Sequence, residues 1–269
     1  MVDKLMKKNG GKNGRTKARC TPLANARGQV ALFIIIGVVL VSVILIFFLV
    51  IQPKSLSGKS ANLGFEGCVE DAVSQGIFEL EKTMGFINPE FTYAYQGQGI
   101  PYLCYSNEYL EPCTVQKPFL KQHFEGELTL FVEDNINSCY SNSIANLKSQ
   151  GYDVKSGNVD FEIYFELNSV RVSINAPTTV GAGTFEKFNV QVNSPIYEML
   201  MLATSVIQSE TKFGDGNTDS LMLLHQDYIV LKLKQSEGTT IYIIRHKTFI
   251  DEITFASRSL VYPPGHYIA

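Results

Sequence analysis

Twenty-two consecutive positions, residues 30–51, carry no ionisable side chain, and this run constrains the chain more than any other feature. Only Gly37 and Ser42 in it are not plainly apolar. A helix of this length rises roughly 33 Å, which matches a hydrocarbon core of about 30 Å. A helix also satisfies its own backbone hydrogen bonds where water is absent. The run therefore predicts a transmembrane helix over residues 29–52. A helix buried in a soluble core is the alternative, and it would need protein on every side.

The charges on the two sides of this run predict its orientation. Residues 1–28 carry eight Lys or Arg against one acid, Asp3, and basic segments stay on the cytoplasmic side of a membrane. From Pro53 onward the chain has 15 basic and 25 acidic residues, a net charge of −10. We therefore expect a cytoplasmic amino terminus, an extracytoplasmic body, and no nucleic-acid partner, because an acidic body repels polyanions. A secretory signal cleaved near Ser55 to Ser57 is the alternative.

The same features divide the chain into four parts. Pro53 and the Ser, Gly and Lys residues after it end the apolar run, which is typical of a break and a short linker. The expected parts are a basic cytoplasmic leader (1–28), the transmembrane helix (29–52), the linker (53–65) and an extracytoplasmic α+β domain (66–269).

A short motif at the start of the apolar run suggests processing. Arg27-Gly28-Gln29 followed by a hydrophobic helix resembles the class III signal peptide of archaeal type IV pilin-like proteins, over residues 27–51. The resemblance implies cleavage between Gly28 and Gln29 by a membrane prepilin-type peptidase. At the fifth mature position, where many pilins carry a glutamate, this chain has Phe33. The basic leader, the apolar span and the cysteine-bearing acidic exterior also resemble uncharacterised archaeal single-span surface proteins, a resemblance that implies no activity.

Four of the five cysteines lie in the expected exterior, where an oxidising environment favours disulfides. Four cysteines allow three connectivities. We favour Cys104–Cys113 as a local clip and Cys68–Cys139 as a long-range link between two helices. A zinc site is the alternative, but no C-x2-C spacing occurs and the four histidines are dispersed. We therefore expect no metal and no cofactor, and we expect Cys20, on the cytoplasmic side, to be a free thiol.

Apolar spacing predicts the elements of the exterior domain. Apolar residues three and four positions apart predict helices, at residues 66–84, 117–138, 141–150, 195–211 and 220–227. Alternation of apolar and polar residues predicts strands, at residues 91–95, 100–105, 109–110, 159–165, 170–174, 185–192, 228–234 and 240–246. The expected fold class is α+β, with an antiparallel sheet packed against amphipathic helices.

One turn-rich stretch offers a weak metal signal. Asp215, Asn217 and Asp219 occupy alternate positions, a spacing at which oxygen ligands can converge on calcium. An EF-hand loop counted from Asp215 needs a glycine at position six and a glutamate at position twelve, but these positions are Ser220 and Gln226. We therefore expect a solvated loop, whose Thr218 or Asp219 caps the following helix.

Compact catalytic motifs are absent from the sequence. It contains no G-x-S-x-G elbow, HExxH helix, Walker loop or dinucleotide fingerprint. His225 near Asp227 and His246 near Arg245 have no evident catalytic partner. The carboxylate pairs Glu79/Glu81 and Asp251/Glu252 are interpreted as solvated charge. We therefore expect that the protein is not an enzyme.

These observations favour a membrane-anchored cell-surface structural or interaction protein, of which a pilin-like filament subunit is one form. The expected location is the cell membrane, with a single pass. The expected partners are the lipid bilayer, the prepilin-type peptidase, and other copies that associate through the transmembrane helix or the outer domain. A tethered extracytoplasmic ligand-binding module, or a hydrolase without a recognisable motif, is the alternative.

Overall fold

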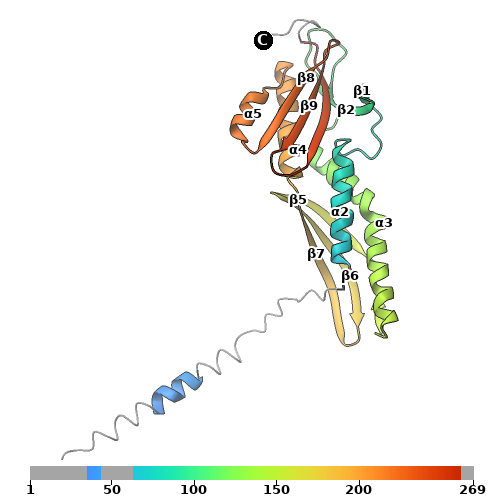
Figure 1. Ribbon diagram of the computed structural model, residues 1–269, viewed down its shortest axis with the longest axis vertical. Helices are drawn as coiled ribbons and strands as arrows, with labels where there is room; N and C mark the ends of the chain where they lie inside the picture. Colours follow the sequence, from blue (N-terminus) through green and yellow to red (C-terminus); the bar gives the residue numbers. More distant parts are fainter. Residues whose placement is uncertain (1–34, 44–62, 262–269) are drawn as a thin grey trace, which may run out of the picture. The chain divides into compact units, whose positions relative to one another are not determined.

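A computed structural model of the protein describes residues 35–43 and 63–261. It divides the chain into two units, Met1–Gly58 and Lys59–Ala269, which are described separately. In the first unit, the described residues form one short helix. In the second unit, they form an α+β domain (Figure 1).

The structure corrects the expected transmembrane helix. In the described ranges, no helix is both long enough and apolar enough to cross a membrane. The prediction of a spanning helix over 29–52 is therefore wrong for the described residues. The remaining residues of that range lie outside them.

The helices of the second unit follow the apolar spacing of the sequence. They are α2 (Glu66–Glu81), α3 (Leu120–Ser149), α4 (Ile196–Phe213) and α5 (Thr218–Leu224). The expected break between helices 117–138 and 141–150 is wrong, because α3 continues through it. Buried residues keep the helical spacing across the expected break, at Ile136, Cys139, Tyr140, Ser143 and Ile144.

The strands form two sheets. They are β1 (Thr92–Tyr95), β2 (Gln98–Tyr105), β3 (Thr114–Val115), β4 (Val154–Ser156), β5 (Asp160–Glu166), β6 (Ser169–Val180), β7 (Gly183–Asn193), β8 (Tyr228–Lys234), β9 (Thr239–His246) and β10 (Glu252–Arg258). In the six-stranded sheet the order is β1-β2-β10-β9-β8, and β3 also pairs with β2. In the four-stranded sheet, β6 pairs with β4, β5 and β7.

The six-stranded sheet corrects the expectation of a purely antiparallel sheet. β10 pairs with β2 in parallel and with β9 in the antiparallel sense, so this sheet is mixed. β10 was not among the predicted strands, although Ile253 and Phe255 alternate with polar neighbours. It is a central strand, and it joins the β8–β9 hairpin to the strands near the start of the domain.

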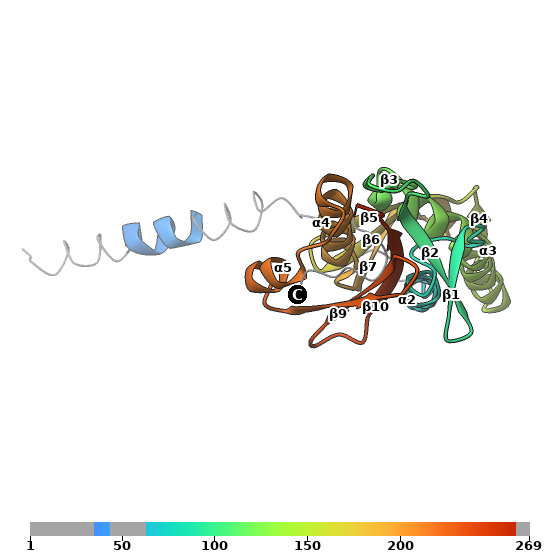
Figure 2. The same cartoon turned by 90° about the horizontal axis from the view of Figure 1, so that it is seen from above.

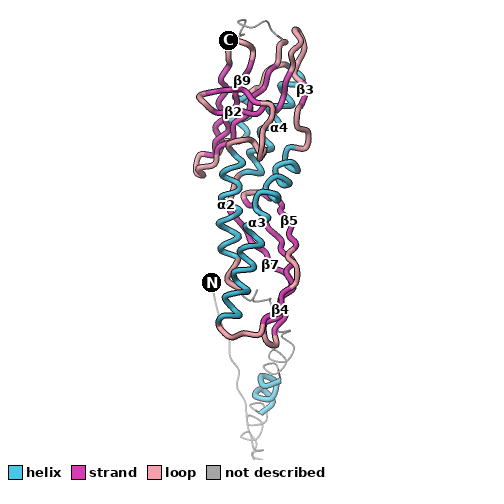
Figure 3. Tube along the Cα trace, turned by 90° about the vertical axis from the view of Figure 1, so that its right-hand side faces the viewer, coloured by secondary structure: helices cyan, strands magenta, loops and turns pink. Residues whose placement is uncertain are grey.

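The four-stranded sheet packs against two long helices. Figure 3 shows α2 and α3 side by side, with β4, β5 and β7 running along them. The helices approach closely at Gly76, where an added Cβ would lie 2.7 Å from the Leu128 side chain. A continuous core of buried apolar side chains links these helices to both sheets, from Val73 through Val172 to Tyr242.

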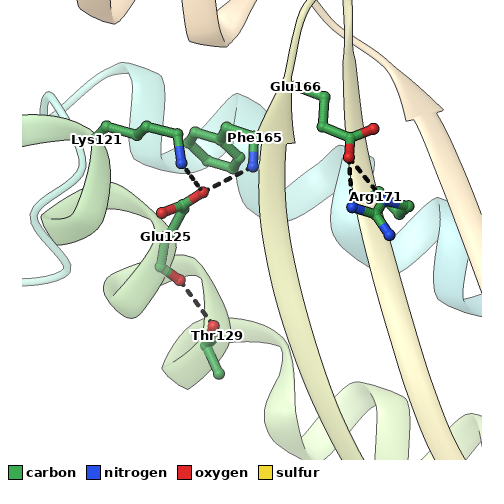
Figure 4. Close-up of polar contacts among 6 residues, drawn as sticks. All are labelled: Lys121, Glu125, Thr129, Phe165, Glu166 and Arg171. Carbon is green, nitrogen blue, oxygen red and sulfur yellow. Dashed lines mark hydrogen bonds and ion pairs between the residues drawn. The ribbon is translucent and has the colours of Figure 1, made fainter.

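Glu125 links α3 to β5, a strand at the edge of this sheet, through a hydrogen bond. Glu125 Oε1 accepts the Phe165 N–H of β5 at 2.7 Å and the Lys121 ammonium at 2.6 Å (Figure 4). Glu166 and Arg171 pair across the β5–β6 hairpin at 2.5 Å. The hydrogen bond from Phe165 to Glu125 therefore joins the helix to the sheet in addition to the apolar core.

Candidate functional site

The prediction of disulfide bonds is confirmed. Cys68 of α2 is joined to Cys139 of α3, and Cys104 of β2 is joined to Cys113. These are the two pairs that the spacing favoured. The first bond links the two long helices, and the second closes the loop between β2 and β3. The predicted processing site at Gly28 and Gln29 lies outside the described residues.

A polar cleft of about 730 Å³ lies where α4, α5 and β8 meet. Asp215, one of the three candidate calcium ligands, faces the Lys232 ammonium in an ion pair. Asn217, the second, caps α5 by accepting the Ser220 N–H at 3.1 Å. The cap expected at Thr218 or Asp219 is therefore wrong by one or two residues. Lys232 also donates to the Gly216 carbonyl at 2.9 Å, so these groups hold the loop in place.

A buried acid lies behind this cleft. Glu210 of α4 is 1% exposed and accepts a hydrogen bond from the Tyr242 hydroxyl of β9. That hydroxyl also accepts the Gly216 N–H at 3.0 Å. Burial raises the pKa of the Glu210 carboxyl, and hydrogen bonds from Tyr242 and Ser259 oppose the rise. These contacts join α4, β9 and the loop at Gly216, which gives Glu210 a structural role.

We expect Tyr242→Phe to lower the free energy of unfolding by about 2–3 kcal/mol, because the Gly216 N–H and a Glu210 oxygen then lose a buried partner. Urea denaturation measures the change. Tyr152→Phe is the matched control, since Tyr152 is 54% exposed, and we expect it to shift stability by less than about 0.5 kcal/mol. Equal stability of the two variants would contradict the assigned role of the Tyr242 hydroxyl.

The two histidines near charged residues are not brought into a catalytic arrangement. His225 is exposed at the carboxyl end of α5. His246 Nδ1 accepts the backbone N–H groups of Thr248 and Phe249, at 3.0 and 3.1 Å, and so closes the turn after β9. In the described part of the chain, no group of three His, Cys, Asp or Glu side chains could hold a metal ion.

The carboxylate pairs fall in different environments. Glu79 is exposed and pairs with Lys82 at 2.8 Å, and Glu252 is ion-paired with Arg245. Glu81, in contrast, is only 3% exposed, so its interpretation as solvated charge is wrong. The sequence held a signal for this burial, because position 81 is four residues after Ile77 on the apolar stripe of α2.

The six-stranded sheet has a second apolar face, directed away from α4. Directly paired residues of neighbouring strands share a face. The inner face carries Tyr242, which bonds to Glu210 of α4, and Figure 2 shows α4 on one side of β9 and β10. The residues of the other face, which we call the outer face, are Ile229, Leu231 and Leu233 of β8, Ile241, Ile243 and Arg245 of β9, Glu252, Thr254 and Ala256 of β10, and Tyr102 of β2.

The outer face is covered at one end and open at the other. Ile100, Tyr102 and Ala256 are buried beneath a cluster with Tyr93 and Tyr95 of the β1–β2 hairpin. On β8, at the edge of the sheet, Ile229 and Leu231 each remain 37% exposed. An open row of branched aliphatic side chains on a sheet is typical of a protein interaction surface.

Comparison with protein-family models, curated proteins and solved structures finds no match for this chain.

Proposed function

We propose that this protein is a cell-surface structural or interaction protein whose disulfide-bonded domain assembles with a second copy of itself through the outer face. The exposed Ile229 and Leu231, together with the partly buried Ile243 paired to Leu231, carry the proposal. β9 carries apolar residues on both faces, Tyr242 and Ile244 on the inner one and Ile241 and Ile243 on the outer one, as strands buried on both sides do. The inner face is covered by α4, and a second molecule would cover the open part of the outer face.

The charges on the outer face fit a second copy. Its ion pair consists of Arg245 and Glu252, whose side chains are 49% and 39% exposed. In a two-fold dimer the same surface meets itself, so each Arg245 can approach Glu252 of the other copy. The apolar row lies beside this pair, because Leu231 and Ile243 are paired one row further along the sheet. One charge of each sign beside an apolar row makes the surface self-complementary.

The covalent links support a location outside the cytoplasm. Two disulfides in one domain persist in an oxidising compartment and are rare in a reducing one. The net charge of −10 from Pro53 onward also suits a soluble, exposed surface. The proposed role is therefore binding and assembly at the cell surface.

Sedimentation equilibrium of the full-length protein tests the proposal. The protein is kept unreduced, in a mild non-ionic detergent because residues 30–51 are apolar. We expect a monomer–dimer equilibrium, and we expect Leu231→Lys to raise its dissociation constant at least about tenfold by placing a charge in the apolar row. Leu130→Lys, at a position that is 63% exposed on α3, is the matched control and should leave the constant unchanged. A monomer at every concentration, or equal effects of the two variants, would refute the proposal.

A further inference from the structure

A second concave site lies between α2, the end of β7 and the turn that precedes β10. It is a cavity of about 160 Å³, well below the 300–1,000 Å³ of pockets for drug-sized ligands. Ile77, Phe78 and Ile250 give it apolar walls. Phe78 and Ile250 are 49% and 90% exposed, so they stand at the surface of the domain. The volume suits a single extended side chain.

The polar lining of the cavity comes from α2, the end of β7 and the turn before β10, and consists of Ser74, Glu81, Asn193, Ser194 and Asp251. Glu81 of α2 lies close to the Asp251 carboxyl, which raises its pKa, and to the Glu252 backbone, which lowers it. The Ser194 hydroxyl donates to Asp251 Oδ1 at 3.4 Å and accepts the Ile196 N–H at 3.2 Å. The Ser194 hydroxyl therefore makes both of these hydrogen bonds to groups of the protein itself.

Glu81 retains one acceptor without a partner. Its side chain belongs to the lining of the cavity, and its Oε1 accepts no hydrogen bond in the described part of the chain. A buried acceptor left without a donor costs about 1–3 kcal/mol. Burial first, and then the Asp251 carboxylate, raise the pKa of Glu81 to about 9. Glu81 is therefore neutral at pH 7, and Asp251 supplies the negative charge.

Among the residues that the structure describes, no Lys or Arg belongs to the lining of this cavity. The nearby cations are already paired, Lys82 with Glu79 and Arg245 with Glu252. A group that enters the cavity therefore meets negative charge and acceptors, and the Lys82 ammonium lies 4.2 Å from the centroid of the Phe78 ring that forms one apolar wall.

From this geometry we propose that the cavity binds a primary alkylammonium group, with the alkyl stem between Phe78 and Ile250 and the ammonium at Glu81 Oε1 and the Asp251 carboxylate. An ammonium has three N–H donors and no acceptor, so it complements the acceptor oxygens of Glu81 and Asp251 in this lining. A methylene stem packs along apolar walls while its charged head reaches a carboxylate. A metal ion fits less well, because calcium takes six to eight oxygen ligands. The ammonium can come from a free amine or from a lysine side chain of another protein.

NMR titration of the full-length, unreduced protein tests this proposal with n-pentylammonium as the probe. We expect saturable shifts of the backbone amides of Glu81, Ser194 and Glu252. 1-Pentanol has the same stem without the charge, and we expect it to bind at least about tenfold more weakly. A lysine-containing peptide and a matched norleucine peptide form the second arm. Binding of the peptide alone would assign the site to a partner protein, and binding of the free amine alone would assign it to a small molecule.

Variants separate the two contacts. We expect Asp251→Asn, which removes the charge, and Glu81→Leu, which removes the acceptor, each to weaken binding at least about tenfold. Glu81→Gln keeps an acceptor oxygen and should change binding less than about threefold. Glu79→Gln, at an exposed position of the same helix, is the matched control and should have no effect. No saturable shift with either probe, or full binding in both Asp251→Asn and Glu81→Leu, would overturn the proposal.

Discussion

Replacing both Cys68 and Cys139 with alanine is expected to lower the free energy of unfolding by about 4 kcal/mol, the larger of the two disulfide effects. This bond closes a loop with a sequence separation of 71 residues and links α2 to α3. In the chain-entropy model, a longer closed loop restricts the unfolded chain more. Urea denaturation of the unreduced protein measures the change, since the bond must be intact in the reference protein.

The second disulfide provides the matched comparison. Cys104 and Cys113 are only nine residues apart, so their replacement with alanine should cost about 3 kcal/mol, less than the first pair. Reduction of both disulfides in the unaltered protein should lower the free energy of unfolding at least as much as the double replacement with the larger effect. Stability within about 1 kcal/mol of the original protein for both double variants would contradict the structural role given to these bonds.

Stability is expected to fall as the pH rises, because of Glu81. Its pKa is raised from 4.5 to about 9 in the folded protein, by burial and then by Asp251. Between pH 4.5 and about pH 9, the folded state therefore keeps a proton on Glu81 that the unfolded state has released. The contribution of Glu81 to the free energy of unfolding is fully present below pH 4.5, and it is lost as the pH rises toward 9. The slope is about −1.4 kcal/mol per pH unit, so the loss from about pH 6 to pH 8 is on the order of 3 kcal/mol.

Glu81→Gln isolates this contribution. The amide resembles the protonated acid but does not titrate, so the variant should gain stability relative to the original protein as the pH rises. Chemical denaturation at a series of pH values gives both curves. Glu79→Gln, at an exposed position on the same helix, should leave the pH dependence unchanged. Parallel curves for the original protein and Glu81→Gln would show that Glu81 does not titrate differently on folding.

The helices and the disulfides could be predicted from local pattern. Val69, Val73 and Ile77 mark the buried stripe of α2 by their spacing alone. The pairing of Cys68 with Cys139 follows once two adjacent helices are expected. The predicted helix 66–84 extends past the end of α2 at Glu81, and the cause of this error is local. Met84 and Gly85, which lie beyond the end of α2, have φ values of 54° and 82°. A left-handed residue after a helix ends it, although apolar spacing continues through Met84.

The sheet topology and the acid cavity could not be predicted in this way. β10 pairs in parallel with β2, about 150 residues away in the chain, and no local pattern encodes that partner. The environment of Glu81 depends on Asp251 and Ser194, which only the completed fold brings to α2. The outer face also needs the strand register, because it is formed by residues of four strands.

Photo-crosslinking from the outer face tests the proposed self-assembly most directly. A benzophenone amino acid replaces Leu231 in the full-length, unreduced protein, and the same replacement at Leu130 of α3 is the control. After irradiation, we expect covalent dimers from position 231 only, with crosslinked peptides from β8, β9 or β10 of the other copy. Monomers alone from position 231, or crosslinks that lead to α3 or to the four-stranded sheet, would contradict assembly through the outer face.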